Sequence, residues 1–224
     1  MNTGGGIVGG DRLETVVTAL ADASATITSQ AAERVYRALK EPARLTTRLT
    51  VCATATLAWL PQETIIFDGA RFERSTEIEL SPGAELLALE WLVLGRAAHG
   101  EKIAGGRITD GWRVKIDGRL IWADSFQATD EVFPRLQCRA LLADFKAIGT
   151  LVYFGPDLDA QLQLMRELSP SLKCQCVATT IASLLIARFA AEASVDLKDR
   201  LRTVLAQFGR TRSTAFRPPK MWSG

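Results

Sequence analysis

A weak internal repeat constrains the fold of this chain more than any other feature of its sequence. Three stretches share the pattern of a strand, a short turn and then Ala-x-aliphatic, at a spacing of roughly thirty residues. They are ADASATIT, VCATATLAWL and SPGAELLALEWL, with Ala25, Ala55 and Ala84 aligned. A unit of about two strands and a turn cannot bury its apolar face alone, whereas stacked units can. The repeat therefore favours stacked β-strand layers, although an ordinary β-meander can give a similar pattern.

Strict alternation of residue types within the same region also indicates strands. In FERSTEIEL, one face carries Phe72, Arg74, Thr76, Ile78 and Leu80, and the other carries three glutamates and a serine. This period of two is typical of a strand with one exposed face. Similar patterns occupy residues 44–51 and 112–126, the second with Asp117-Gly118 as a hairpin turn.

The last third of the chain is predicted to contain two helices. Apolar residues recur at helical spacing between Pro156 and Pro170, and again in SVDLKDRLRTVLAQFGR, where Ser194 is the expected N-cap and Gly209 the expected C-cap. Residues 177–189 between them have the composition of one buried strand. The predicted fold is therefore mainly β, with stacked β-helix-like sheets and two α-helices in the C-terminal half.

The glycine-rich start of the sequence allows two interpretations. Gly4, Gly6 and Gly9 satisfy G-x-G-x-x-G, and Asp11 and Glu14 have the spacing of a helix-capping box. A dinucleotide-binding loop would need a buried strand before the glycines and a helix after them. Only three residues precede the first glycine, and the β-branched run at 15–18 favours a strand. The other interpretation is close backbone packing at positions where only glycine fits.

Composition excludes several classes of function. The net charge of +2 gives no reason to expect nucleic acid or an anionic membrane as a partner. The longest apolar stretch is interrupted by Arg188 and is too short to span a bilayer. Four irregularly spaced cysteines do not form a disulfide framework, which favours a reducing cytoplasmic location. With His99 as the one histidine, neither a histidine metal cluster nor a triad with a spare histidine can form, so we predict no catalytic residues.

Five blocks of the sequence occur in an order that resembles one known family. They are NTGGGIVGGDRLE, SQAAERVYRA, LAWLPQETIIFDGARFERSTEIEL, GAELLALEWLVLGRAAHGE and the closing PPKMW. In this order they resemble the urease accessory protein UreD family, which is called UreH in some bacteria. The likeness runs from Asn2 nearly to the end of the chain, and LPQETIIFDGAR is its most specific block.

The resemblance implies an assembly factor that is not an enzyme. UreD-like proteins bind UreF and, with UreF and the GTPase UreG, form a complex on apo-urease that delivers nickel to the active site. The implied fold is right-handed, β-helix-like and all-β, with a pair of helices. Nickel would be in transit, and no cofactor of its own is expected. We assign residues 1–224 to a single UreD-like domain, and we expect it to lack the strands that family members carry before the NTGGG segment.

Acidic residues within the matching blocks are the candidate nickel ligands. Carboxylates bind nickel less tightly than imidazole or thiolate does, so they suit transfer better than storage. The candidates are Asp11, Glu33, Glu63, Asp68, Glu90 and Glu101. Either a subset of them lines an internal path, or they pair with arginines such as Arg12, Arg34, Arg71 and Arg96 to stabilise the fold. Replacing Glu63 or Asp68 by alanine distinguishes a nickel path from a structural role. Loss of a path residue lowers urease nickel content and preserves the UreF complex, whereas loss of a structural residue disrupts the complex itself.

Four further residues are weaker candidates. Cys174 and Cys176 could share a soft metal ion, although a full site normally has four ligands. His99, at a position where the family often has an apolar residue, is either a metal ligand or a hydrogen-bonded structural residue. Trp222 in the tail is either part of the core or an anchor for a partner such as UreF, since tryptophan is favoured at interface hot spots.

Three hypotheses for function remain at this point. The first is a nickel-insertion chaperone subunit of the UreD family. The second is a nucleotide-binding enzyme that uses the Gly4/Gly6/Gly9 loop. The third is an inactive, truncated relative of UreD.

Overall fold

The computed structural model describes residues 5–96, 100–136, 138–168 and 173–222. The strands are β1 (Arg12–Ala19), β2 (Ser24–Ile27), β3 (Glu33–Val35), β4 (Ala43–Val51), β5 (Thr56–Trp59), β6 (Thr64–Ile66), β7 (Arg71–Leu80), β8 (Glu85–Leu94), β9 (Arg107–Ile116), β10 (Arg119–Ala128), β11 (Ala147–Phe154), β12 (Cys174–Ile181) and β13 (Leu184–Ala191). The helices are α1 (Leu158–Leu168) and α2 (Ser194–Thr211), with short 3-10 helices η2 (Phe133–Arg135), η3 (Thr214–Phe216) and η4 (Lys220–Trp222).

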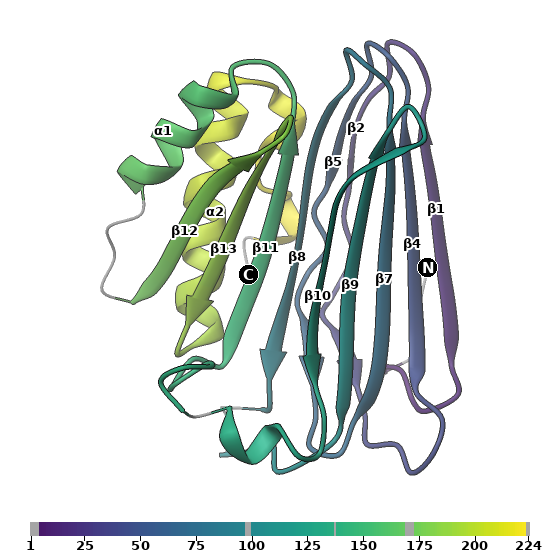
Figure 1. The fold of residues 1–224 in the computed structure, drawn as a ribbon, viewed down its shortest axis with the longest axis vertical. Helices are drawn as coiled ribbons and strands as arrows, with labels where there is room; N and C mark the ends of the chain where they lie inside the picture. Colours follow the sequence, from purple (N-terminus) through teal and green to yellow (C-terminus); the bar gives the residue numbers. More distant parts are fainter. Residues whose placement is uncertain (1–4, 97–99, 137, 169–172, 223–224) are drawn as a thin grey trace.

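Two sheets stack face to face along most of the chain (Figure 1). One sheet has the order β1-β4-β7-β9-β10, and its strands are parallel except for β10. The other has the order β12-β13-β11-β8-β5-β2, in which β6 also pairs with the second half of β8 and β3 pairs with β6. Because the chain passes repeatedly from one sheet to the other, the parallel strands form stacked coils. The predicted mainly β fold with stacked sheets and two late α-helices is confirmed.

Turn geometry sets the register of the repeat and corrects the predicted alignment. Pairing of β2 with β5, and of β5 with β8, makes Ala23 and not Ala25 equivalent to Ala55 and Ala84. Each of these alanines follows a residue with positive φ: Asp22 (61°), Thr54 (65°) and Gly83 (82°). The same left-handed turn thus recurs in three successive coils. The predicted alignment of the first repeat was wrong by two residues. Gly83 marks the turn in the third repeat, but the equivalent positions in the first two are Asp22 and Thr54, which do not identify a left-handed turn from sequence.

The alternation in β7 and the β9–β10 hairpin are confirmed. Every second residue of β7 is buried between the sheets, including Arg74 and Thr76 as well as the apolar side chains. The hairpin turn places Asp117 and Gly118 at φ of 49° and 74°. An arginine on the buried face of a strand needs an oppositely charged or hydrogen-bonding partner. The partner of Arg74 must therefore lie in the space between the two sheets.

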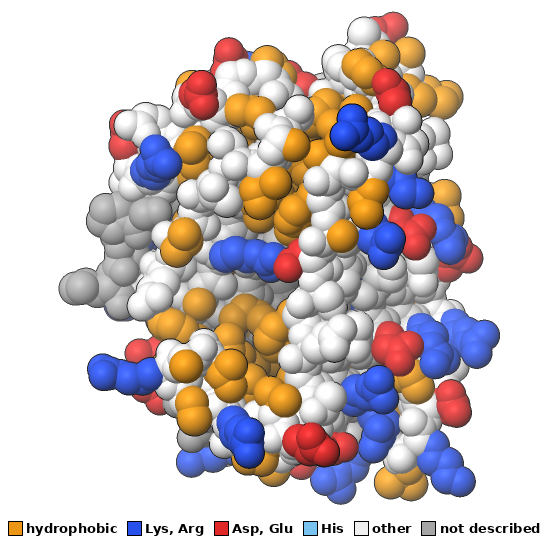
Figure 2. All heavy atoms as spheres, in the orientation of Figure 1, with side chains coloured by type: hydrophobic (Ala, Val, Ile, Leu, Met, Phe, Trp, Pro, Cys, Tyr) orange, Lys and Arg blue, Asp and Glu red, His pale blue; other side chains and the backbone are white. Residues whose placement is uncertain are grey.

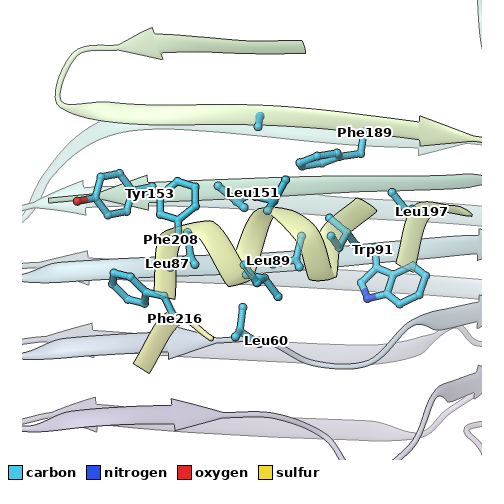
Figure 3. Packing of buried hydrophobic residues seen from close by; sticks show 14 of the residues in the cluster. Leu60, Leu87, Leu89, Trp91, Leu151, Tyr153, Phe189, Leu197, Phe208 and Phe216 are labelled. Atoms are coloured by element: carbon cyan, nitrogen blue, oxygen red, sulfur yellow. The ribbon is translucent and has the colours of Figure 1, made fainter. Parts of the chain in front are cut away.

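Both α-helices cover one face of the eight-stranded sheet (Figure 1). Figure 3 shows Leu197 and Phe208 of α2 lying against Trp91, Leu151 and Tyr153 of the strands. The rings of Tyr153 and Phe208 are 5.2 Å apart between centroids. The sheet therefore has an apolar core on each side, one beneath the helices and one against the other sheet. No helix in the described part of the chain is long and apolar enough to cross a membrane.

Two predicted boundaries in the C-terminal third were wrong. Residues 177–189 do not form one strand, because the chain turns at Ala182 (φ 51°) between β12 and β13. No Gly, Pro or Asn marks this turn within an apolar run. The second helix begins at Ser194 after Ala193, its N-cap, and it continues through Gly209. Gly209 is not a cap because the chain folds back over it, with the Cα of Arg217 only 3.1 Å from where a Cβ would lie.

The glycine-rich segment packs against the next coil and does not begin a nucleotide-binding fold. Strand β1 follows it, so the helix that a dinucleotide loop requires is absent. A Cβ on Gly9 would lie 2.5 Å from the carbonyl oxygen of Glu41, and one on Gly6 would lie 2.6 Å from that of Arg34. Gly4 lies outside the described residues. The close-packing interpretation is thus confirmed for Gly6 and Gly9, and the nucleotide-loop hypothesis is wrong.

Candidate functional site

Three ionisable side chains meet in the space between the two sheets. Arg74 comes from β7, Asp110 from the adjacent strand β9, and Glu90 from β8 in the opposite sheet. They are 5%, 8% and 3% exposed respectively. Charged residues are almost never this buried unless they are paired, and these three pair with one another.

Arg74 is the centre of this cluster. Its Nε and Nη2 donate to the two carboxylate oxygens of Asp110 at 2.8 and 2.7 Å. Its Nη1 donates to the Oγ1 of Thr64 at 3.2 Å, and its Nε lies 3.1 Å from the Oε2 of Glu90. Burial alone would lower the pKa of Arg74, but the Asp110 and Glu90 carboxylates raise it above its ordinary value. The guanidinium therefore keeps its charge inside the protein.

Glu90 also receives hydrogen bonds from side chains of β5 and β7. The indole Nε1 of Trp59 donates to Oε1 at 3.0 Å, and the Thr76 hydroxyl lies 3.0 and 2.9 Å from the two carboxylate oxygens. Burial raises the pKa of Glu90; Arg74 opposes this effect, while the charge of Asp110 adds to it. The carboxylate is therefore held in a fixed orientation in an environment that disfavours its charge.

A cavity of about 220 Å³ extends from this cluster between the two sheets. Glu90 and Asp110 line it together with Asp124 and Arg188, which are more exposed. Arg188 of β13 bonds the Asp124 carboxylate of β10 and donates to the Thr150 hydroxyl at 2.6 Å. Figure 2 shows hydrophobic side chains around a hollow between the two halves of this face. The cavity thus connects buried carboxylates with an ion pair nearer the surface.

Two of the predicted carboxylates hold loops in place. Asp68 accepts from the backbone N–H groups of Ala104 and Gly105 at 2.7 and 3.2 Å and pairs with Arg37 at 3.2 Å. The bond from Ala104 is the main reason that the pKa of Asp68 is lowered. Glu101 pairs with Arg96 at 3.0 Å, and this hydrogen bond is the main cause of its lowered pKa.

The other predicted carboxylates do not join Glu90 in one metal site. Asp11 accepts from the backbone N–H of Val8 at 2.9 Å, closing the turn before β1. Glu33 and Glu63 lie on neighbouring coils, where the Glu33 N–H donates to the Glu63 carbonyl at 2.9 Å. One carboxylate oxygen of Glu63 is buried with no hydrogen-bond partner among the described residues. The described ranges contain no group of three or more His, Cys, Asp or Glu arranged to hold a metal ion.

Comparison with known proteins identifies the family. A family model described as "UreD urease accessory protein" matches residues 1–223. The chain belongs to the UreD family. A urease accessory protein UreD of Rhodopseudomonas palustris (strain BisB18) is 39% identical over 99% of this chain and 78% of its own length. Those of Mesorhizobium japonicum and Azorhizobium caulinodans are 39% and 35% identical over 100% of this chain and 79% and 80% of their own lengths.

The weaker candidates occupy varied positions in this UreD-family chain. Burial raises the pKa of the Cys174 thiol to about 11, which disfavours the thiolate form that binds metal. Cys176 follows it on the same face of β12. Trp222 is fully buried, 6.0 Å from Trp91 between ring centroids, so any effect on partner binding has to act through packing of the tail. His99 lies outside the described residues.

Three residues of the site in this UreD-family member were not predicted from the sequence. Asp110 and Asp124 lie on the inner face of the β9–β10 hairpin, outside the most specific matching block. Arg74 had a signal, because the alternation of FERSTEIEL places it among apolar residues on the buried face. A charge predicted to be buried implies a partner, but sequence alone does not identify the strand that supplies it.

Proposed function

We propose that this UreD-family protein is a non-catalytic accessory subunit of urease maturation that passes nickel towards apo-urease. The observation that carries the proposal is the buried carboxylate of Glu90 at the inner end of the cavity. The relatives' name, urease accessory protein, supports a role in the same process. Nickel would be cargo in transit, with no cofactor resident in the protein.

The chemistry of the cavity suits a transported cation better than a stored one. Glu90 and Asp110 offer carboxylate oxygens, with Asp124 further along the same cavity. Oxygen ligands hold nickel less tightly than imidazole or thiolate ligands do. A short series of carboxylates can therefore bind the ion and release it again, without the full ligand set of a permanent site.

The proposed partners are UreF, UreG and the apo-urease subunits, and the proposed location is the cytoplasm. In this arrangement the GTPase chemistry belongs to UreG, and the chain itself contributes a rigid β scaffold with an internal path. Neither nucleic acid nor a membrane has a part in the proposal.

Replacement of Glu90 by glutamine tests the function. Cells whose own ureD gene has been replaced are supplied with the wild-type chain or the Glu90→Gln variant, and the nickel content and activity of purified urease are measured. We expect both the nickel content and the activity to fall by about tenfold or more. The neighbouring Asp110 carboxylate and the hydrogen-bonding groups around it do not replace the lost carboxylate ligand. Co-purification with UreF is expected to remain unchanged.

Glu77→Gln is the matched control. Glu77 lies on the outer face of β7, which points away from the second sheet and the cavity, and it pairs with Arg48. It should support normal nickel insertion. Equal nickel content with Glu90→Gln and wild type would contradict the path through Glu90. A wild-type chain that restores no nickel insertion, although it is folded and expressed, would favour the inactive-relative hypothesis.

A further inference from the structure

We propose that Arg74 is a built-in counter-cation that occupies the position of the transported metal and keeps the cavity from trapping it. The inference rests on the proposed nickel path and assigns a role to a residue that would otherwise be only part of an ion pair. A divalent cation would bind between Glu90 and Asp110 only while the guanidinium of Arg74 is displaced.

The geometry places two carboxylates around one point. The Oδ1 of Asp110 and the Oε2 of Glu90 lie 2.8 and 3.1 Å from the same atom, the Nε of Arg74. Carboxylate oxygens coordinate a transition metal such as zinc at about 2.0–2.2 Å. An ion at the position of this nitrogen would therefore need only a small inward movement of both carboxylates.

Two hydroxyl groups add further oxygen atoms beside the cluster. The Thr76 hydroxyl lies 2.9 Å from the Oε2 of Glu90, and the Thr64 hydroxyl lies 3.2 Å from the Nη1 of Arg74. Hydroxyl and carboxylate oxygens together suit a labile site for a divalent cation. The adjoining cavity gives a transported ion access without unfolding of either sheet.

Electrostatic repulsion between the two carboxylates explains why an arginine lies between them. Two carboxylates buried side by side repel each other and are costly unless a cation accompanies them. Arginine stays protonated, so it cannot vacate the position by losing a proton and has to move as a charged group. Competition with this fixed charge lowers the affinity for any divalent cation, which leaves the ion free to continue along the path.

Removal of Arg74 should convert the path into a tight metal site. Nickel binding to the purified full chain is measured by equilibrium dialysis and titration calorimetry, for wild type and for Arg74→Gln. We expect affinity for Ni²⁺ to rise by about tenfold or more, since a positive charge is removed from the binding position. The gain should disappear in the double variant Arg74→Gln/Glu90→Gln.

Arg48→Gln is the matched control. Arg48 also bridges two carboxylates, Glu14 and Glu77, but on the exposed outer face of the same sheet. Because water solvates these groups, the change should not create a tight nickel site. A gain in affinity with Arg48→Gln equal to that with Arg74→Gln would overturn the inference, as it would reflect only the change in net charge.

A conservative variant keeps the test decisive if Arg74→Gln does not fold. Arg74→Lys retains the charge but not the two-pronged contact with Asp110, so we expect an intermediate gain in Ni²⁺ affinity. If the folded Arg74→Lys variant binds nickel no better than wild type, the inference is wrong. The proposed function is judged separately, because it depends on urease nickel content in cells with Glu90→Gln and not on binding to the isolated chain.

Discussion

At the residue scale, close contact between coils determines where glycine is needed. Gly9 lies against the backbone of the loop before β4, where a Cβ would be 2.5 Å from the Glu41 oxygen and 2.7 Å from the Cβ of Ala38. Nothing lies within 4 Å of the corresponding position on Gly5. The two glycines of one segment therefore have different structural importance, although their local sequences are alike.

Gly9→Ala should destabilise the protein, and Gly5→Ala should be tolerated. We expect the first change to lower the free energy of unfolding by about 1–3 kcal/mol, because the added methyl group overlaps a backbone oxygen. The second should change it by less than about 0.5 kcal/mol. Urea denaturation followed by circular dichroism measures both, and equal stability of the two variants would contradict the close-packing explanation.

At the element scale, single carboxylates connect loops of successive coils. Asp68 follows β6, yet it binds the backbone of the segment that leads into β9, at Ala104 and Gly105. The backbone N–H of Gly69 also donates to the Gly105 carbonyl at 3.0 Å. The loops at this end of the stack are thus held together by hydrogen bonds that connect one coil to the next.

Acid should release this connection. Because the folded-state pKa of Asp68 is lowered from 3.8, its carboxylate stabilises the folded protein above that pH, and the stabilisation is lost as the pH falls through the lowered pKa. We expect the amide resonances of Ala104 and Gly105 to shift in an NMR titration from about pH 5 to about pH 2, with a midpoint below 3.8. Asp68→Asn should abolish the transition, and a midpoint at or above 3.8 would argue against the interaction.

At the scale of the whole molecule, α2 completes one of the two cores of the eight-stranded sheet. Its buried residues include Leu201, Leu205 and Phe208. They pack beneath strands β11–β13, which extend the eight-stranded sheet beyond β8. Strands β11–β13 are thereby covered by helices on one face, and residues of β11 and β13 line the cavity. Loss of the helix packing is therefore expected to weaken the support of the site from behind.

Phe208→Ala should lower the free energy of unfolding by about 3–5 kcal/mol, because it opens a cavity beside Tyr153. Val195→Ala is the control on the same helix, since Val195 is 60% exposed, and it should change stability by less than about 0.5 kcal/mol. Thermal and urea unfolding provide the measurement. A small effect of Phe208→Ala would mean that α2 contributes little to the core.

Alternating strands such as β7, the stacked organisation of the repeat and the two late helices could be predicted from the sequence, although the first repeat was aligned two residues out of register. Alternation in β7 and the Asp117-Gly118 turn depend on local sterics and on which face of an element is apolar, and these are visible in a short window. The alternation also places Arg74, a charged residue, among positions predicted to be buried, which indicates that it has a buried partner. It did not contain the turn at Ala182, which no local residue type marks.

The groups that meet in the site are brought together by contacts between strands that are far apart in the sequence. Arg74 and Asp110 are 36 residues apart and lie on adjacent parallel strands, while Glu90 comes from the facing sheet. Their meeting depends on the register between coils and on the distance between the sheets. A shift of one residue in β9 would turn the Asp110 carboxylate to the outer face, and the same shift in β7 would turn Arg74 outward. Such long-range geometry is set by the packing of the whole stack and cannot be read from the spacing of residues along the chain.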